Sequence, residues 1–586
     1  MIKLFKDFKK KDILLMLVVL ILIVLQVWLE LKMPDYMSKI TILVQTSGSK
    51  MNDILYNGGF MLLCALGSLV SAVIVSYIVS YISSVFSLRT RKKLFDKVEN
   101  LGMWEVKKFS TSSLITRTTN DITQIEMLIG LGLQLILKAP ITAIWAITKI
   151  LNKSWQWSSL TALAVVILLS VVGVLMVIVV PKFKIVQRLI DKLNDVTREN
   201  LTGIRVVRAF NAEAYQEAKF NDVNTKLTNQ QLFNQKAFAV LAPVMYLVMY
   251  SLALLIYFIG AFLIKDAGLA DKITIFSDMV VFSTYAMQVI MSFLMLAFIF
   301  MILPRASVSA KRINEVLDTN VSIKDGDMDI NTSEVGTVEF RNVSFKYPDA
   351  EEYLLENISF KVKKGETIAF IGSTGSGKST LINLVPRFYD VTAGEVLVDG
   401  VNVKDYKLEN LYKKIVYFTK RAVIFNGSIN YNIAYCDSGK KITTDKIKEA
   451  VSIAQATEFV EKMDNKYSSH IASGGTNVSG GQKQRLSIAR AIAKDPEIYI
   501  FDDSFSALDY KTDATLRKSL KKYTKDATIL IVAQRIGTIM NADKIIVLDN
   551  GECVGIGTHK ELLKTCEVYK QIALSQLSKE ELENER

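Results

Sequence analysis

The sequence predicts an all-α transmembrane domain of six helices, followed by an α/β domain with a helical subdomain. A chain of 586 residues is too long for one hydrophobic core, so at least two domains are expected. Long apolar runs are confined to residues 1–305, whereas residues 336–575 have the mixed composition of a soluble α/β domain. We therefore expect the membrane domain at residues 1–318, a linker at 319–335 and the soluble domain at 336–586.

Several stretches of the first domain are long and apolar enough to cross a bilayer as helices, which takes about 20 residues each. One such stretch could be a buried helix of a soluble protein, but several in order disfavour that interpretation. The charged start, MIKLFKDFKKKD, resembles part of a signal peptide. Because the apolar stretch after it is too long and no small-residue cleavage site follows, we expect a retained anchor. The six predicted spans are residues 13–33, 58–86, 128–151, 158–180, 237–264 and 276–303.

The net charge of +13 does not indicate a nucleic-acid partner, because much of it flanks the apolar runs. Basic residues are concentrated between the second and third spans, such as Arg89 and Lys93, and between the fourth and fifth, such as Lys182 and Arg205. Positive segments of membrane proteins face the cytoplasm. We therefore expect a multi-pass protein of the cytoplasmic membrane whose N-terminus and soluble domain are cytoplasmic.

The cysteines have no paired spacing, which argues against a disulfide framework or a zinc site and fits a reducing cytoplasm. They are Cys64, Cys436, Cys553 and Cys566.

Two features stand out within the predicted spans. Lys138 lies several residues into the third span, where an ammonium is costly unless it finds water or a partner. It either lines a polar path or extends to the interface. Met287, Met291 and Met295 recur every fourth residue in the sixth span, with Phe298 close to the same face. Such a stripe can adapt to varied apolar ligands, although packing against a neighbouring helix is the commoner explanation.

The soluble domain contains a phosphate-binding loop. The stretch 368–380, IAFIGSTGSGKST, places a strand, a glycine-rich turn and a helix start in order and fits the pattern G-x-x-x-x-G-K-[ST]. Glycines let backbone N–H groups approach the phosphates, and the helix N-terminus adds positive potential. The lysine reaches the terminal phosphates and the serine ligates Mg²⁺. The predicted ATP-binding residues are Gly372, Ser373, Thr374, Gly375, Ser376, Gly377, Lys378, Ser379 and Thr380.

A second glycine-rich motif opens an amphipathic helix at residues 477–492. Its start also offers free N–H groups and a helix dipole to an anion. It lies just before the strand IYIFDD, which ends in Asp502 and Asp503. The motif consists of Ser479, Gly480, Gly481 and Gln482.

With these motifs in this order, the chain resembles the ABC transporter family, specifically the six-span exporters that fuse one membrane domain to one ATPase domain. The resemblance covers nearly the full length and includes SALD at 506–509. It implies that Tyr347 stacks on adenine and that Asp502, with Ser379, ligates Mg²⁺. It also implies that residues 115–122 and 199–210 touch the ATPase domains. Two halves would hold two ATP molecules, each between the phosphate loop of one half and the SGGQ motif of the other.

The chain departs from the family pattern at three positions around the γ-phosphate. The residue that activates water is glutamate in active members and is Asp503 here, one methylene shorter, although proton abstraction requires a base within hydrogen-bond reach. The switch histidine falls at Gln534, which cannot carry the proton that imidazole can. The glutamine that contacts Mg²⁺ falls at Lys420. The two histidines, His470 and His559, lie elsewhere in the sequence, and we expect both at the surface.

These departures predict a site that holds ATP and hydrolyses it poorly. Since the SGGQ motif is intact, we expect a heterodimer in which a different half-transporter supplies the catalytic glutamate and histidine. The favoured function is ATP-driven export of amphipathic or drug-like compounds. The alternatives are a dedicated peptide or lipid exporter, and an ATP-gated regulatory membrane protein with vestigial hydrolysis.

Overall fold

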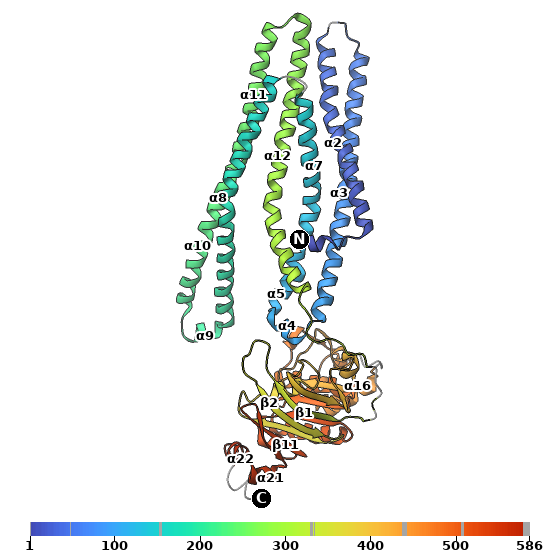
Figure 1. Ribbon diagram of the computed structural model, residues 1–586, viewed down its shortest axis with the longest axis vertical. Helices are drawn as coiled ribbons and strands as arrows, with labels where there is room; N and C mark the ends of the chain where they lie inside the picture. The colour runs from blue at the N-terminus through green and yellow to red at the C-terminus, as the bar shows by residue number, and fades with distance from the viewer. Residues whose placement is uncertain are drawn as a thin grey trace. The chain divides into compact units, whose positions relative to one another are not determined.

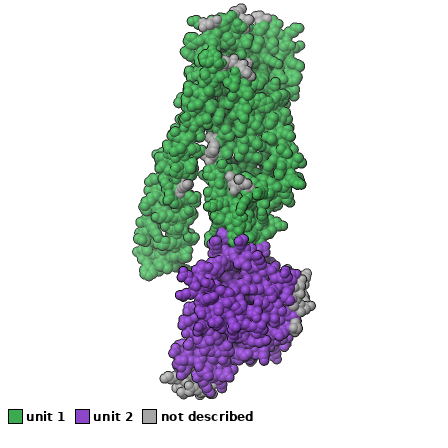
Figure 2. All heavy atoms as spheres, in the orientation of Figure 1, with its two compact units in different colours: residues 1–99, 110–319 green, residues 100–109, 320–586 purple. Residues whose placement is uncertain are grey.

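The computed structural model describes residues 2–46, 48–151, 155–328, 332, 334–435, 442–505 and 509–577 (Figure 1). The chain divides into two compact units, one of residues 1–99 and 110–319, the other of residues 100–109 and 320–586 (Figure 2). Residues 506–508 of the SALD stretch and Cys436 lie outside the described residues.

The first unit is helical throughout its described residues. Its third span is interrupted by two π-helical turns, η1 and η2, which are common near functional positions. The helices are α1 Ile2–Phe5, α2 Lys10–Gln45, α3 Met51–Glu99, α5 Thr111–Thr116, η1 Arg117–Asp121, α6 Ile122–Met127, η2 Leu128–Gly132, α7 Leu133–Leu151, α8 Trp155–Thr202, α9 Ile204–Ala209, α10 Glu213–Ala239, α11 Leu241–Asp266 and α12 Leu269–Leu317.

The prediction of six membrane spans is confirmed. Among the described residues, six segments are long and apolar enough to cross a bilayer: Lys10–Gln45, Met51–Glu99, Thr111–Leu151, Trp155–Thr202, Glu213–Lys265 and Asp271–Leu296. Many large apolar side chains on them stay exposed, for example Tyr77 and Val177 at 75% each. Since water would penalise such a surface, it is the surface expected of helices that contact lipid.

The helices of the first unit form two groups in Figure 1. Helices α2, α3, α7 and α12 pack side by side, and α8 packs with α10 and α11, which also contacts α12. The apolar core of the unit includes Ile23 and Val27 of α2, Val75 of α3, and Phe282 and Val289 of α12, all fully or almost fully buried.

The described part of the second unit contains two larger sheets and a two-stranded pair. One sheet has the order β2-β1-β4-β5 and the other the order β12-β11-β3-β10-β9-β6; β7 pairs with β8. The strands are β1 Val338–Phe345, β2 Leu355–Val362, β3 Thr367–Gly372, β4 Ala393–Val398, β5 Val401–Asn402, β6 Ile415–Phe418, β7 Gly427–Ser428, β8 His470–Ile471, β9 Ile498–Asp502, β10 Thr528–Val532, β11 Lys544–Asp549 and β12 Glu552–Gly557.

Helices surround these sheets. Those of eight or more residues are α16 Thr444–Ile453, α18 Gly480–Lys494, α19 Tyr510–Tyr523 and α22 Glu567–Leu574. The shorter ones are α4 Met103–Lys108, α13 Lys378–Asn383, α14 Leu408–Lys414, α15 Ile429–Ile433, α17 Thr457–Glu461, α20 Ile536–Ile539 and α21 His559–Thr565, with single 3₁₀ turns at η3 Lys466–Ser468 and η4 Ser473–Gly475.

The central parallel strands of the six-stranded sheet, β11, β3, β10 and β9, are buried on both faces. Along β3, Ile368 and Phe370 belong to one apolar cluster, whereas Ala369 and Ile371 belong to another. Such two-sided burial explains why the parallel strands are continuous apolar runs rather than alternating ones. The predicted fold class, a helical membrane domain followed by an α/β domain, is confirmed.

One expectation from the sequence is wrong. His559 was expected at the surface but is buried, at 5% exposed, and its Nδ1 lies 2.6 Å from the hydroxyl oxygen of Tyr569. Helices α21 and α22 pack together and enclose the ring. His470 is exposed, as expected.

Candidate nucleotide site

The sheet order brings the predicted site residues to one edge. Strands β3, β10, β9 and β6 are parallel neighbours, so their carboxyl ends meet at the same edge of the sheet. The phosphate loop follows β3, Gln534 follows β10, Asp502 ends β9, and Lys420 follows β6. Ligands of open α/β sheets bind outside this edge. Segments up to about 160 residues apart in sequence therefore converge on one site.

The phosphate loop has the backbone that its glycines permit. Gly377 has a φ of 88°, and a Cβ atom there would lie 2.6 Å from Cδ2 of Leu355. The Lys378 ammonium donates to the carbonyl oxygens of Gly372 at 2.9 Å and Ser373 at 2.6 Å. Burial lowers the pKa of the Lys378 ammonium below its usual range, although the nearby Asp503 and Asp502 carboxylates oppose the shift. The loop thus forms a narrow cradle with a buried cation at its base.

Asp502 is held by two hydroxyl groups. Ser379 donates to Oδ1 at 2.7 Å, and Tyr417 of β6 donates to Oδ2 at 3.0 Å. Burial and the neighbouring Asp502 carboxylate raise the pKa of the Tyr417 phenol, which keeps it a donor. The sequence did not single out Tyr417. Its role depends on a contact with a residue 85 positions away, which no local pattern indicates.

Asp503 is paired with Lys420. The Lys420 ammonium lies 2.7 Å from Oδ2 of Asp503, and the two side chains are 59% and 11% exposed. The hydrogen bond to Asp503, reinforced by its charge, raises the pKa of Lys420. Asp503 has a φ of 49°, in the left-handed region that only a few non-glycine residues adopt. Two of the three positions that depart from the family pattern, Lys420 and Asp503, therefore contact each other directly.

Gln534 lies beyond the end of β10 with an exposed side chain. Its backbone carbonyl accepts from Gln576 at 2.8 Å, which ties the residue to the C-terminal helices. Strand β10 lies next to β3 and two strands from β6. The Gln534 side chain is therefore at the same edge of the sheet as the phosphate loop and Lys420.

Tyr347 lies beside the phosphate-loop helix in an aromatic group. Its hydroxyl is 3.0 Å from that of Thr380, and its ring contacts Tyr389 edge-on at 5.4 Å between centroids. Trp104 and Lys107 of α4 lie over the same tyrosine, with a centroid distance of 6.4 Å and an ammonium distance of 5.7 Å. The sequence did not indicate this contact, because α4 precedes Tyr347 by more than 200 residues.

The SGGQ motif opens α18 with a reciprocal cap. The hydroxyl of Ser479 accepts from the backbone N–H of Gln482 at 3.3 Å, and the Gln482 side chain accepts from the N–H of Ser479 at 2.8 Å. Gly480 lies at the first helical position and is exposed. The motif therefore presents a helix N-terminus at the surface of the unit.

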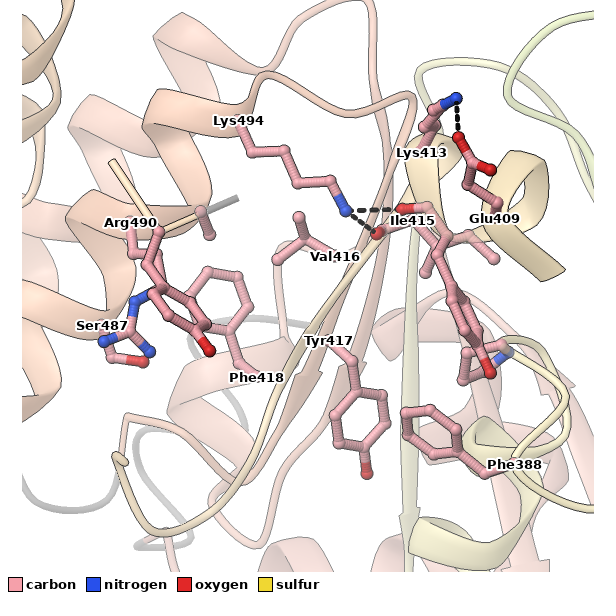
Figure 3. Close-up of a pocket in the computed structure, with 14 residues that line it drawn as sticks. Phe388, Glu409, Lys413, Ile415, Val416, Tyr417, Phe418, Ser487, Arg490 and Lys494 are labelled. Carbon is pink, nitrogen blue, oxygen red and sulfur yellow. Dashed lines mark hydrogen bonds and ion pairs between the residues drawn. The ribbon is translucent and has the colours of Figure 1, made fainter. Parts of the chain in front are cut away.

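A cavity of about 480 Å³ lies between β6, α14 and α18 (Figure 3). Tyr417 and Phe388 line one side of it, and Arg490 and Lys494 of α18 line the other. Lys494 donates to the carbonyl oxygen of Ile415 at 2.9 Å. Since Tyr417 also donates to Asp502, one side chain connects this cavity to the nucleotide edge.

The membrane unit holds a smaller apolar cavity of about 180 Å³. It is lined by Val172, Leu175, Met176, Phe238, Leu241, Leu294 and Phe298. Phe298, which the sequence placed beside the methionine stripe, lines it, whereas Met287, Met291 and Met295 are not among the lining residues. Met291 is 45% exposed.

The arrangement fits a nucleotide with Mg²⁺. The cradle around Lys378 suits phosphates, and the Ser379 hydroxyl and Asp502 carboxylate are oxygen ligands of the kind that Mg²⁺ prefers. When bound, Mg²⁺ would neutralise phosphate charge. Lys420 stands where the family has a glutamine that contacts Mg²⁺, and its ammonium offers the metal no oxygen ligand.

Two family descriptions match the chain: "ABC transporter transmembrane region" over residues 14–293 and "ABC transporter" over residues 355–506. An uncharacterised ABC transporter ATP-binding protein of Mycobacterium tuberculosis is 37% identical over 88% of this chain and 87% of its own length. The ATP-dependent lipid A-core flippase of Pseudomonas aeruginosa is 33% identical over 81% of this chain and 77% of its own length. The structure of a bacterial Atm1-family ABC exporter with ATP bound has the same fold, with a TM-score of 0.81 and 22% identity. The match covers 97% of this chain and 100% of the exporter chain.

Proposed function

The chain belongs to the ABC transporter family, and from this premise we propose that it is one half of a heterodimeric exporter of amphipathic compounds. Its ATPase unit and its membrane spans are those of an ATP-driven exporter. The finer proposal is that its own phosphate loop holds ATP and scarcely hydrolyses it. The observation that carries this is the Lys420–Asp503 ion pair at 2.7 Å.

The ion pair weakens the site in two ways. A carboxylate that is already paired with an ammonium is a poorer base toward water, because its lone pairs and charge are partly engaged. Asp503 is also one methylene shorter than the glutamate of active members. Gln534 adds a third departure, since an amide cannot take up a proton as imidazole does. Nucleotide binding does not need these groups and is carried by the cradle around Lys378.

The exposed SGGQ motif supports a different partner. In the family arrangement this motif meets the ATP on the other half. If two identical chains assembled, each intact motif would face a site with all three departures. A partner with the catalytic glutamate and histidine would make one of the two composite sites competent, and this chain would contribute Ser479 to it.

A dedicated lipid exporter is the second candidate. It is supported by the identity to the lipid A-core flippase of Pseudomonas aeruginosa, 33% over 477 residues. Both candidates export an amphipathic molecule from the membrane, and they differ in how narrow the substrate range is.

Purification of the chain alone and together with a candidate half-transporter that carries the catalytic glutamate and histidine tests the proposal. We expect ATP binding but little ATPase activity from the chain alone, and vigorous activity from the complex. Vigorous hydrolysis by the chain alone would contradict the heterodimer. Transport by inverted membrane vesicles, compared between lipids and unrelated amphipathic drugs, distinguishes the two substrate classes.

A further inference from the structure

Charged and polar side chains from three helices meet inside the apolar segments of the first unit. Lys138 of α7 donates to Oε1 of Glu30 of α2 at 2.9 Å. The same oxygen accepts from Gln26 at 2.9 Å and from Ser68 of α3 at 3.1 Å. The side chains of Lys138 and Glu30 are only 18% and 24% exposed. We name these four residues the intramembrane cluster; helices α2, α3 and α7 lie side by side in Figure 1.

A second ion pair lies further along the same two helices. Lys149 of α7 donates to Asp35 of α2 at 2.7 Å, and the Tyr285 hydroxyl of α12 donates to the other oxygen of Asp35 at 2.6 Å. Lys32 lies 4.0 Å from the same carboxylate. The sequence drew attention to Lys138 alone. The acidic partners, Glu30 and Asp35, were visible only as charges interrupting the first apolar run.

The Lys138 ammonium has donor capacity beyond its contact with Glu30. Oε1 of Glu30 accepts three protein donors, and both oxygens of Asp35 accept donors. An ammonium has three N–H groups. Among the described residues, the only hydrogen-bond acceptor of Lys138 is Glu30. Three ammonium groups, with Lys32 included, face two carboxylates. The region therefore favours an additional anion over an additional cation.

The cluster is not a closed structural network. Within the described part of the chain, Oε1 of Gln26 and the hydroxyl of Thr142, one helical turn after Lys138, are buried without a hydrogen-bond partner. Gln26 itself is 4% exposed. A buried polar group without a partner is destabilising, and ionisable groups inside a membrane are rare unless they serve a function. Both facts disfavour a cluster that serves packing alone.

We propose that Lys138 binds the anionic head group, such as a phosphate, of an amphipathic substrate, and that Glu30 is a positioning residue that holds the ammonium in place. The inference rests on the proposed export function and narrows its substrate class to anionic amphipaths. The apolar part of such a molecule would lie against the exposed apolar surfaces of the spans.

Thermal unfolding of the purified assembled protein in a neutral maltoside detergent tests this without requiring hydrolysis or transport. The probes are dodecyl phosphate, dodecyltrimethylammonium and inorganic phosphate. We expect dodecyl phosphate alone to raise the unfolding temperature. Lys138→Gln should raise the concentration for half of this effect by about tenfold or more, because a charged hydrogen bond is lost. Glu30→Gln should weaken the response by less than Lys138→Gln does, because the ammonium keeps its charge but loses the carboxylate that positions it. Lys265→Gln, which changes an exposed lysine at the end of α11, should respond as the unchanged protein does.

An unchanged response of Lys138→Gln would overturn the inference, as would an equal response to dodecyltrimethylammonium. An equal response to inorganic phosphate would indicate a free-anion site and overturn the amphipathic substrate. If Lys138→Gln does not fold, the double variant Glu30→Gln/Lys138→Gln leaves no unpaired charge and should fold without the dodecyl phosphate response. ATP hydrolysis by the same assembly, measured separately, reports on the proposed function, so the two can fail independently.

Discussion

Replacing Asp503 with asparagine should change the complex little, whereas replacing Ser479 with arginine should nearly abolish its ATPase activity. Lys420 is 59% exposed, so solvent screens its pair with Asp503, and such pairs contribute about 0.2–1 kcal/mol. Asparagine tolerates the left-handed backbone that position 503 requires. We therefore expect Asp503→Asn to lower the free energy of unfolding by less than about 1 kcal/mol. Turnover should change by less than about twofold, because a base that is already paired provides little of the rate enhancement of about 10²–10⁴ that general bases usually give. Loss of Ser479 from the competent site should cost about 10²–10³ in rate.

The test measures steady-state ATPase rates of both variant complexes at saturating ATP, together with their thermal unfolding. Ser479 also caps α18, and loss of a cap costs about 1 kcal/mol. Thr558 caps α21 with the same reciprocal arrangement, so Thr558→Arg controls for the cap: it should lose similar stability and keep its ATPase activity. A loss of tenfold or more from Asp503→Asn, with Ser479→Arg tolerated, would refute the proposed division between the two sites.

Four further outcomes are expected. The chain purified alone should bind ATP with little turnover, and vigorous turnover by spectrophotometric assay would contradict this. Lys378→Ala should greatly weaken labelling of this chain by a photo-reactive ATP analogue. Because burial lowers the pKa of Lys378, its charge is lost at a lower pH than that of an ordinary lysine, so ATP affinity should fall as pH rises into the alkaline range; a flat profile would count against this role. Tyr417→Phe removes a donor to Asp502 and should weaken Mg²⁺-dependent nucleotide binding by about tenfold, whereas Tyr412→Phe, which lines the same cavity, should not.

The order of the site could be predicted because its parts are linear motifs attached to apolar strands. The phosphate loop follows β3 and Asp502 ends β9, and parallel strands bring their carboxyl ends to one edge. Each departure from the family pattern could likewise be read at a single position. The contacts between these residues could not be predicted from the sequence. The pairing of Lys420 with Asp503, for example, depends on the placement of β6 beside β9.

The contacts that the sequence missed join segments distant in the chain. Tyr417 reaches Asp502 across neighbouring strands, and Glu30 reaches Lys138 across 108 positions. Periodicity and motif spacing describe one segment at a time and carry no information on such pairs. The burial of His559 has the same origin, because the contact with Tyr569 exists only once α21 and α22 pack together.

If this chain's own site holds ATP and scarcely hydrolyses it, the nucleotide bound to the chain after turnover should still carry its γ-phosphate. The complex would be incubated with Mg²⁺ and a photo-reactive ATP analogue labelled at both the α- and γ-phosphates, crosslinked, and its two chains separated. We expect the γ-to-α label ratio on this chain to stay close to that of the free analogue, while the ratio on the partner falls. A ratio near zero on this chain would show that its site hydrolyses ATP and would contradict the proposed function.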